Sequence, residues 1–92
     1  MEVEIMKVTV QIGLRSDKVA TKLTKDVELS CLPNVGAWVL VDTGTENTSF
    51  RVGCVDVYVD ENRAYLRCET TTRDNDAVLQ SYLASLRAKG WV

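Results

Sequence analysis

The 92-residue sequence predicts an α+β fold: about five antiparallel strands, strongly bent into a small open barrel, with one C-terminal helix. Apolar and polar residues alternate between about residues 2 and 70, which is typical of half-buried strands. From about residue 75 to 89 the apolar residues recur instead at three- and four-residue spacings, as on an amphipathic helix. The apolar phase slips at residues 3–6 and again at Gly53-Cys54, which predicts bulges that bend the sheet. An open two-layer sheet with the helix on one face is the alternative, and in either case residues 1–92 make one domain.

The first two strands are expected to form a long, twisted hairpin. In the first strand, one phase is apolar throughout and carries Val8, Val10, Ile12 and Leu14. A turn at residues 15–18 follows, and in the second strand the apolar phase carries Val27, Leu29 and Cys31. The opposite phase of both strands is polar, so we expect one face of the hairpin in the core and the other in solvent.

Residues 33–49 predict a turn, a buried strand and a polar loop. Pro33 cannot continue a ladder and Gly36 is free to adopt a positive φ, so a turn is expected there. The continuous apolar run from Trp38 to Val41 is typical of a strand covered on both faces, which would place Trp38 in the core. A polar loop over residues 42–49 follows, with Gly44 at its tip.

The next hairpin has the most specific predicted register. A turn centred on Glu61-Asn62 pairs residues of matching character: Val57 with Leu66, Val55 with Cys68, Tyr58 with Tyr65, and Asp56 with Arg67. Cross-strand pairs of these kinds contribute roughly 0.2–1 kcal/mol each. A shift by one residue would turn every side chain to the wrong face, so we expect this register to be well determined.

Clear start and stop signals bound the C-terminal helix. Asp74 or Asn75 is placed to cap its first turn, and Gly90 follows it as a left-handed cap. Trp91 falls where a Schellman turn places a hydrophobic contact with Leu86. The single apolar stripe consists of Val78, Leu79, Tyr82, Leu83 and Leu86. We therefore expect the helix to lie across the sheet or across its open end.

Size and charge narrow the classes of function. A chain of this length buries only about 60–65% of its unfolded surface, and self-association is a common source of the missing stability, so we expect a homo-oligomer. The net charge of −2 and the pI near 5.0 disfavour a nucleic-acid partner. Domains that bind nucleic acids usually have a basic stripe and a pI above about 9. The basic residues Arg15, Lys18, Lys22 and Lys25 are diluted by Asp17, Asp26 and Glu28, which indicates a solvated face.

The N-terminal segment predicts neither export nor a membrane anchor. Residues 1–5 alternate acidic and apolar residues and lack the basic start and apolar run of a signal peptide. No apolar stretch approaches the ~18 residues that a membrane span needs. We therefore expect a cytoplasmic protein without a membrane partner, whose three cysteines are reduced thiols.

Motifs for catalysis or metal binding are sparse. The sequence contains no histidine, which excludes Ser-His and Cys-His nucleophiles and every metal site that uses histidine. The five glycines are scattered rather than grouped in a phosphate-binding loop. Cys31, Cys54 and Cys68 lack the paired spacing of a zinc site. We expect Cys31 and Cys68 to be buried as small hydrophobes and leave Cys54, at the expected bulge, as the one candidate for a reactive thiol. No cofactor and no metal are predicted.

One short motif has a catalytic precedent. Residues 39–45, Val-Leu-Val-Asp-Thr-Gly-Thr, resemble the active-site motif of retroviral-type aspartic proteases, homodimers in which each chain supplies one aspartate. The resemblance implies Asp42 as the catalytic carboxylate, Thr43 as the hydroxyl that braces the turn and Gly44 as a close backbone approach. The family's second signature, an apolar-apolar-Gly segment, is replaced by Cys-Glu-Thr-Thr-Thr-Arg at residues 68–73, and no glycine-rich flap follows Asp42. We favour a polar loop after a strand and keep the protease as the alternative function.

A wider resemblance covers roughly residues 8–68. A Leu-Pro turn at residues 32–33, a Val-Gly pair at 35–36 and a following strand and hairpin are similar to a recurring type of small bacterial β-protein. The hairpin positions that carry the resemblance, after Val39, are Phe50, Val52, Val55 and Tyr58. Proteins of this type are mostly uncharacterised and are often encoded on phages, plasmids or integron gene cassettes. The resemblance implies a fold and a mobile-element origin, and no particular activity.

The remaining candidate for function is an aromatic patch on the polar face of the 50–68 hairpin. The residues predicted there are Tyr58, Tyr65, Asp56 and Arg67. Aromatic residues and arginine are enriched in interfaces, so we expect this patch to bind a second copy, or an unknown protein or small molecule. Alternatively, the helix or another strand covers this face. The sequence thus favours a non-enzymatic binding module that self-associates through its tyrosine-bearing face.

Overall fold

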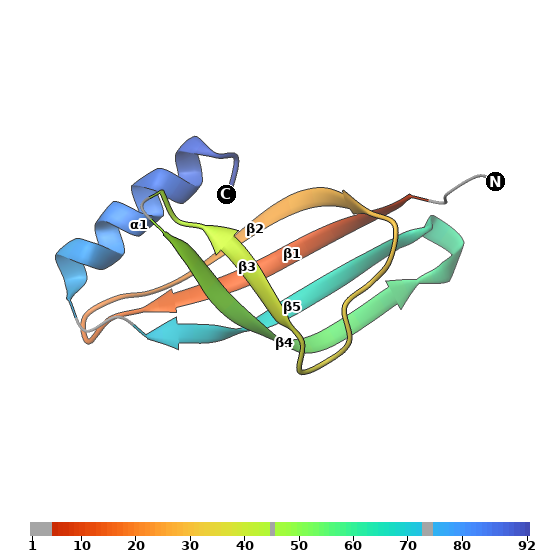
Figure 1. Ribbon diagram of the computed structural model, residues 1–92, viewed down its shortest axis with the longest axis horizontal. Coiled ribbons are helices and arrows are strands. Elements are labelled where there is room, and N and C mark those ends of the chain that lie inside the picture. Colours follow the sequence, from red (N-terminus) through yellow and green to blue (C-terminus); the bar gives the residue numbers. More distant parts are fainter. Residues whose placement is uncertain (1–4, 45, 73–74) are drawn as a thin grey trace.

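Five strands and one helix make up the described part of the chain, residues 5–44, 46–72 and 75–92 of a computed structural model. The strands are β1 (Met6–Arg15), β2 (Ala20–Leu29), β3 (Trp38–Asp42), β4 (Asn47–Tyr58) and β5 (Arg63–Thr72). A 3-10 turn, η1 (Val59–Glu61), joins β4 to β5, and α1 (Asp76–Ala88) follows β5. The strands lie in the order β2-β1-β5-β4-β3 (Figure 1). The predicted α+β class, with five strands and a C-terminal helix, is confirmed.

One strand pair departs from the expected antiparallel arrangement. The hairpin pairs β1–β2, β3–β4 and β4–β5 are antiparallel, but β1 and β5 are parallel. Short turns impose the antiparallel direction on neighbours in the sequence, whereas β1 and β5 are joined only through three intervening strands. The direction of such a non-local pair depends on where the chain returns to the sheet, which apolar patterning does not specify.

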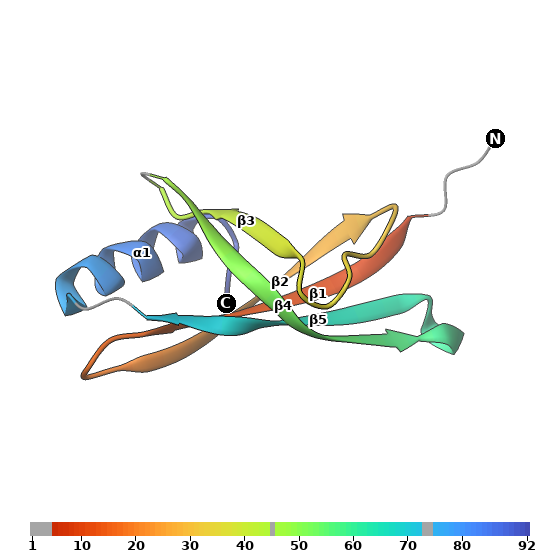
Figure 2. The same ribbon diagram turned by 60° about the horizontal axis from the view of Figure 1, so that its bottom comes forward.

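The sheet curls into a half-barrel because β4 bends and changes partner. Its first half pairs with β3 and its second half with β5, and the register with β5 shifts between Val52 and Cys54. The bulge predicted at Gly53-Cys54 is therefore confirmed. Figure 2 shows β3 and the first half of β4 rising from the other strands and curling over the face on which α1 also lies. At the other predicted slip, Met6 pairs regularly with Leu29, and residues 3 and 4 lie outside the described residues.

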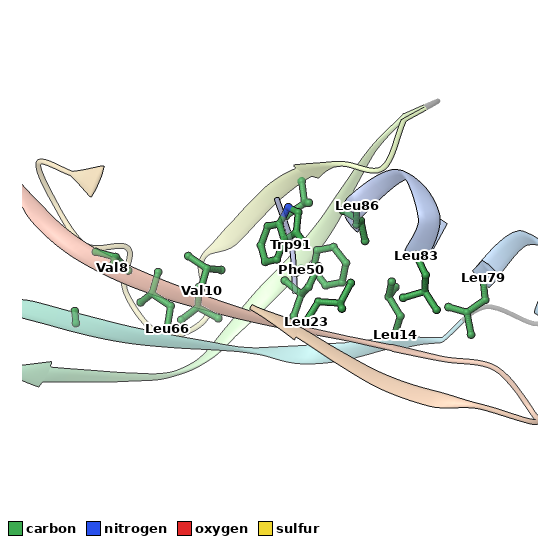
Figure 3. Packing of buried hydrophobic residues seen from close by; sticks show 14 residues of the cluster. Val8, Val10, Leu14, Leu23, Phe50, Leu66, Leu79, Leu83, Leu86 and Trp91 are labelled. Carbon is green, nitrogen blue, oxygen red and sulfur yellow. The ribbon is translucent and has the colours of Figure 1, made fainter. Parts of the chain in front are cut away.

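The core fills the concave face of the half-barrel. The predicted apolar phase of β1 is buried along its whole length, and Phe50 from β4 packs into the same cluster. Three leucines of α1 cover one end of this face, and Trp91 follows them along the chain (Figure 3). The largest fully buried side chains of this core include Ile12, Leu14, Phe50, Leu66, Leu79 and Leu86.

Both ends of α1 are capped as the sequence predicts. The Asn75 side chain accepts hydrogen bonds from the amides of Ala77 and Val78, which selects it over Asp74, a residue outside the described part of the chain. At the other end, the Trp91 amide donates to the Leu86 carbonyl at 3.1 Å, and Gly90 has a φ of +97°. This is the Schellman turn expected from Gly90-Trp91, and it delivers the indole of Trp91 to the core.

The hairpin register is shifted by two residues from the predicted one. The loop contains four residues, Val59 to Asn62, because η1 forms and Asn62 adopts a left-handed φ of 50°. The observed pairs are Val57 with Ala64, Val55 with Leu66, Asp56 with Tyr65, and Tyr58 with Arg63. A shift by an even number keeps every side chain on its predicted face, so the pattern of apolar and polar residues alone could not distinguish the two registers.

Two burial predictions are wrong. Strand β3 is the edge of the sheet and is covered on one face only, so that Trp38 is 65% exposed instead of lying in the core. Cys31 is exposed because β2 ends at Leu29, two residues before it. Both residues lie on the apolar phase of their segment, but no other strand or helix among the described residues covers them.

Candidate functional site

An apolar pocket of about 330 Å³ lies in the gap of the half-barrel between β2 and β3. Its floor includes Val10 and Leu66, which are neighbours across β1 and β5. The remaining apolar lining comes from β2, β3 and the segments beside them: Val27, Leu29, Pro33, Val39, Leu40, Val41 and Trp91. Lys25, Asp42 and Lys89 supply the charged groups of the lining. We call this site the β2–β3 pocket.

The pocket exists because the two edges of the curled sheet do not meet. Among the described residues, β2 pairs with β1 and β3 pairs with β4, and no ladder joins β2 to β3. The chain end closes only one end of the gap: Val92 and Thr24 exchange two backbone hydrogen bonds, of 2.7 and 2.9 Å. Concave-face side chains of β2 and β3 are therefore left without an opposing layer, which opens a small ligand-sized cavity.

Two of the three charged side chains at the pocket form an ion pair, and the third, Lys25, does not do so with any described residue. Lys89 forms a salt bridge with Asp42, whose other carboxylate oxygen accepts a 2.8 Å hydrogen bond from the Gly44 amide. These contacts lower the pKa of Asp42 below its ordinary value, and the contact with Lys89 is the largest cause. No described residue forms an ion pair with Lys25, which is half-buried. The lining thus holds two cations and one anion.

The Asp-Thr-Gly segment forms the turn between β3 and β4 and packs against α1. Thr43 is buried, and its hydroxyl donates to the Glu46 carbonyl at 2.9 Å. Gly44 has a φ of +106°, and a β-carbon there would lie 3.0 Å from the Cβ of Ser85 on α1. These contacts give all three residues of the motif a structural role in docking the β3–β4 turn onto the helix.

The geometry around Asp42 differs from what aspartic-protease chemistry needs. That chemistry requires two carboxylates that share a proton, and their repulsion raises the pKa of one of them. Asp42 instead faces the ammonium group of Lys89, and its pKa is lowered. One chain supplies one Asp-Thr-Gly, so a protease would need Asp42 of two copies to meet and Lys89 to move away.

The tyrosine patch lies on the convex face, opposite α1 and the core. Tyr58 is partly exposed at the end of β4, diagonal to Tyr65 on β5 rather than directly opposite it. The Arg67 guanidinium lies 5.2 Å from the centre of the Tyr65 ring and 3.8 Å from an Asp56 carboxylate oxygen. Among the described residues no helix or strand covers this face, so the exposed patch is observed rather than the covered one. Arg67 already has two partners there, Tyr65 and Asp56.

Among the described residues, neither the cysteines nor α1 provides a further candidate site. Cys54 lies next to the bulge with its Sγ 3.8 Å from Asp56, and burial raises the pKa of Cys68. The described residues contain no group of three cysteine or acidic side chains close enough to hold a metal ion. Within residues 5–44, 46–72 and 75–92, no helix has the length and apolar character to cross a membrane.

Sequence reasoning placed the functional residues on the hairpin and missed the pocket. One signal was present, because Lys25 shares the phase of Leu23, Val27 and Leu29 and so points a charge to the apolar face of β2. The other charged residues, Asp42 and Lys89, are far apart in the sequence and meet only through the turn that docks on α1. Comparisons of the chain with protein-family models, curated proteins and solved structures found no match.

Proposed function

We propose that this chain is a non-enzymatic binding module that self-associates, and that copies meet along the outer edge of β3. The observation that carries the proposal is the exposure of two large apolar side chains on this strand. Trp38 is 65% exposed and Leu40 is 66% exposed. Single exposed apolar residues are common on protein surfaces, but two on the same face of an edge strand form a continuous apolar strip.

The backbone of β3 supports the same contact. Val39 and Val41 pair with Phe50 and Thr48 of β4, and the hydrogen bond from the Thr43 amide to Glu46 continues this series. Peptide groups of alternate residues point to opposite edges of a strand, so those of Trp38 and Leu40 point away from β4. Edge strands of monomers are usually protected by lysine, proline or a bulge, and β3 contains none of these.

Two copies of β3 would pair antiparallel about a two-fold axis at Leu40. The side chains of Leu40 would then be direct neighbours, and Trp38 of each copy would lie opposite Asp42 of the other. Such a contact is isologous, because each copy contributes the same surface. It would also extend the small core of a chain whose size leaves little surface to bury.

The tyrosine patch is the less favoured surface for this contact. Its Arg67 already stacks on Tyr65 and pairs with Asp56, whereas the edge of β3 has backbone groups without partners in the described part of the chain. Burying the paired charges of the patch would require their desolvation. The patch stays a candidate for a different partner.

Light scattering behind size-exclusion, over a concentration series with reductant, tests the proposal. The wild type should give a dimer, and Leu40→Lys should give a monomer with unchanged circular dichroism, because the two lysines would lie side by side at the two-fold axis. Val59→Lys is the matched control, since Val59 is 83% exposed but lies at the β4–β5 turn. A strict monomer at the highest concentration would overturn self-association. A dimer that survives Leu40→Lys but is lost in the Tyr58→Ser/Tyr65→Ser variant would move the contact to the tyrosine patch.

A further inference from the structure

We propose that the β2–β3 pocket binds a small apolar molecule with an anionic head group, of the medium-chain carboxylate class. The tail would occupy the apolar interior, and the carboxylate would meet the ammonium group of Lys25. This site adjoins the contact between copies, because Leu40 belongs to both, and its binding is therefore tested in a variant in which that contact is weakened.

The interior of the pocket suits an unbranched apolar chain. Its floor and walls are aliphatic, and the indole of Trp91 closes the side towards α1. At about 330 Å³ the volume lies near the lower end of the roughly 300–1,000 Å³ typical of ligand sites, which favours a short tail over a drug-sized ring system. The pocket is open between β2 and β3, so a ligand can enter without unpairing a strand.

The charges at the pocket select the head group. Lys89 is held by Asp42, and these two charges compensate each other. Lys25 has no ion-pair partner among the described residues, and its Cε lies 3.7 Å from the position a β-carbon at Gly90 would occupy, next to Trp91. A carboxylate here gains a charge-assisted hydrogen bond. An ammonium head group would face two lysines and only one aspartate that is already paired.

Fluorescence titration of the Trp38→Ser variant tests the proposal, because Trp91 is then the only tryptophan and lies in the wall of the pocket. The substitution also weakens the proposed contact between copies, so the pocket is measured in the monomer. Octanoate, decanoate, decanol and decylamine are the probes. Decanoate should bind about fifteenfold more tightly than octanoate, which is about fourfold per methylene and corresponds to ~0.8 kcal/mol each. It should bind at least tenfold more tightly than decylamine.

Two variants assign the parts of the site. Lys25→Gln should weaken decanoate binding about tenfold and leave decanol unchanged, whereas Lys22→Gln, on the exposed phase of the same strand, should change neither. Val27→Phe should fill the pocket and abolish the binding of both. The proposal is overturned if Trp91 responds to none of the probes below their micelle concentrations, if decylamine binds as tightly as decanoate, or if Val27→Phe folds and binds normally.

Discussion

The tight contact between the Asp-Thr-Gly turn and α1 leads to a specific stability prediction for Gly44→Ala. Gly44 combines a φ of +106° with the close approach to Ser85, so the substitution is opposed both by the backbone and by the neighbouring helix. Gly53 provides a matched control. A β-carbon at Gly53 would make only ordinary contacts, the nearest at 3.5 Å from the Arg67 carbonyl oxygen.

Two costs determine how far Gly44→Ala should lower the free energy of unfolding. Holding an L-residue at a left-handed φ costs about 1–2 kcal/mol. The added methyl group would lie 3.0 Å from the Cβ of Ser85, well inside the 3.5–4.0 Å of a normal carbon contact, and overpacking of this kind costs about 1–3 kcal/mol. The free energy of unfolding should therefore fall by about 2–5 kcal/mol. For a domain of this size each kcal/mol lowers Tm by about 4–8 °C, so Tm should fall by at least ~8 °C.

Urea unfolding followed by circular dichroism measures the loss, with a constant m-value as the check that only stability has changed. Gly53→Ala should change the free energy of unfolding by less than ~1 kcal/mol. In the Ser85→Ala background, Gly44→Ala should cost at least ~0.5 kcal/mol less than in the wild type, because the hydroxyl of Ser85 no longer opposes the methyl group. A loss below ~1 kcal/mol for Gly44→Ala, or equal losses in the two backgrounds, would refute the packing argument.

Two further predictions concern the ends of α1. Because Lys89 lowers the pKa of Asp42, this carboxylate stabilises the fold above its ordinary pKa, and the contribution is lost as the pH falls, below about pH 4, through its lowered value. NMR titration of Asp42 should show a higher pKa in Lys89→Ala than in the wild type, and equal values would contradict the pairing. Asn75→Ala should lower the free energy of unfolding by about 1 kcal/mol, measured in urea, because two amides of the first turn lose their acceptor. Asn75→Asp retains a capping oxygen, so an equal loss in that variant would argue against the capping role.

Features that depend on neighbours in the sequence could be predicted. The α1 caps follow from Asn75 and Gly90-Trp91, and the bulge at Gly53 follows from a phase change within one strand. The convex position of the tyrosine patch also follows from strand alternation, since even a register two residues away preserves the faces. Each of these is decided within one strand, one hairpin or one helical turn.

Features that depend on where distant segments meet could not be predicted in the same way. The apolar run of β3 has the same composition whether one face or both faces are covered, so the exposure of Trp38 emerges only from the edge position of this strand. The parallel pairing of β1 with β5 likewise depends on the route of the chain between them.

The sequence by itself determined the α+β class, the elements and their inward faces, because alternation and capping act over a few residues. Only the tertiary structure decided that β2 and β3 stop short of each other and leave an apolar pocket between them. It also decided that Lys25, Asp42 and Lys89 share that pocket, since they come from three different parts of the chain. The docking of the β3–β4 turn on α1 brings Asp42 to Lys89, and this is a long-range packing event that no local pattern encodes.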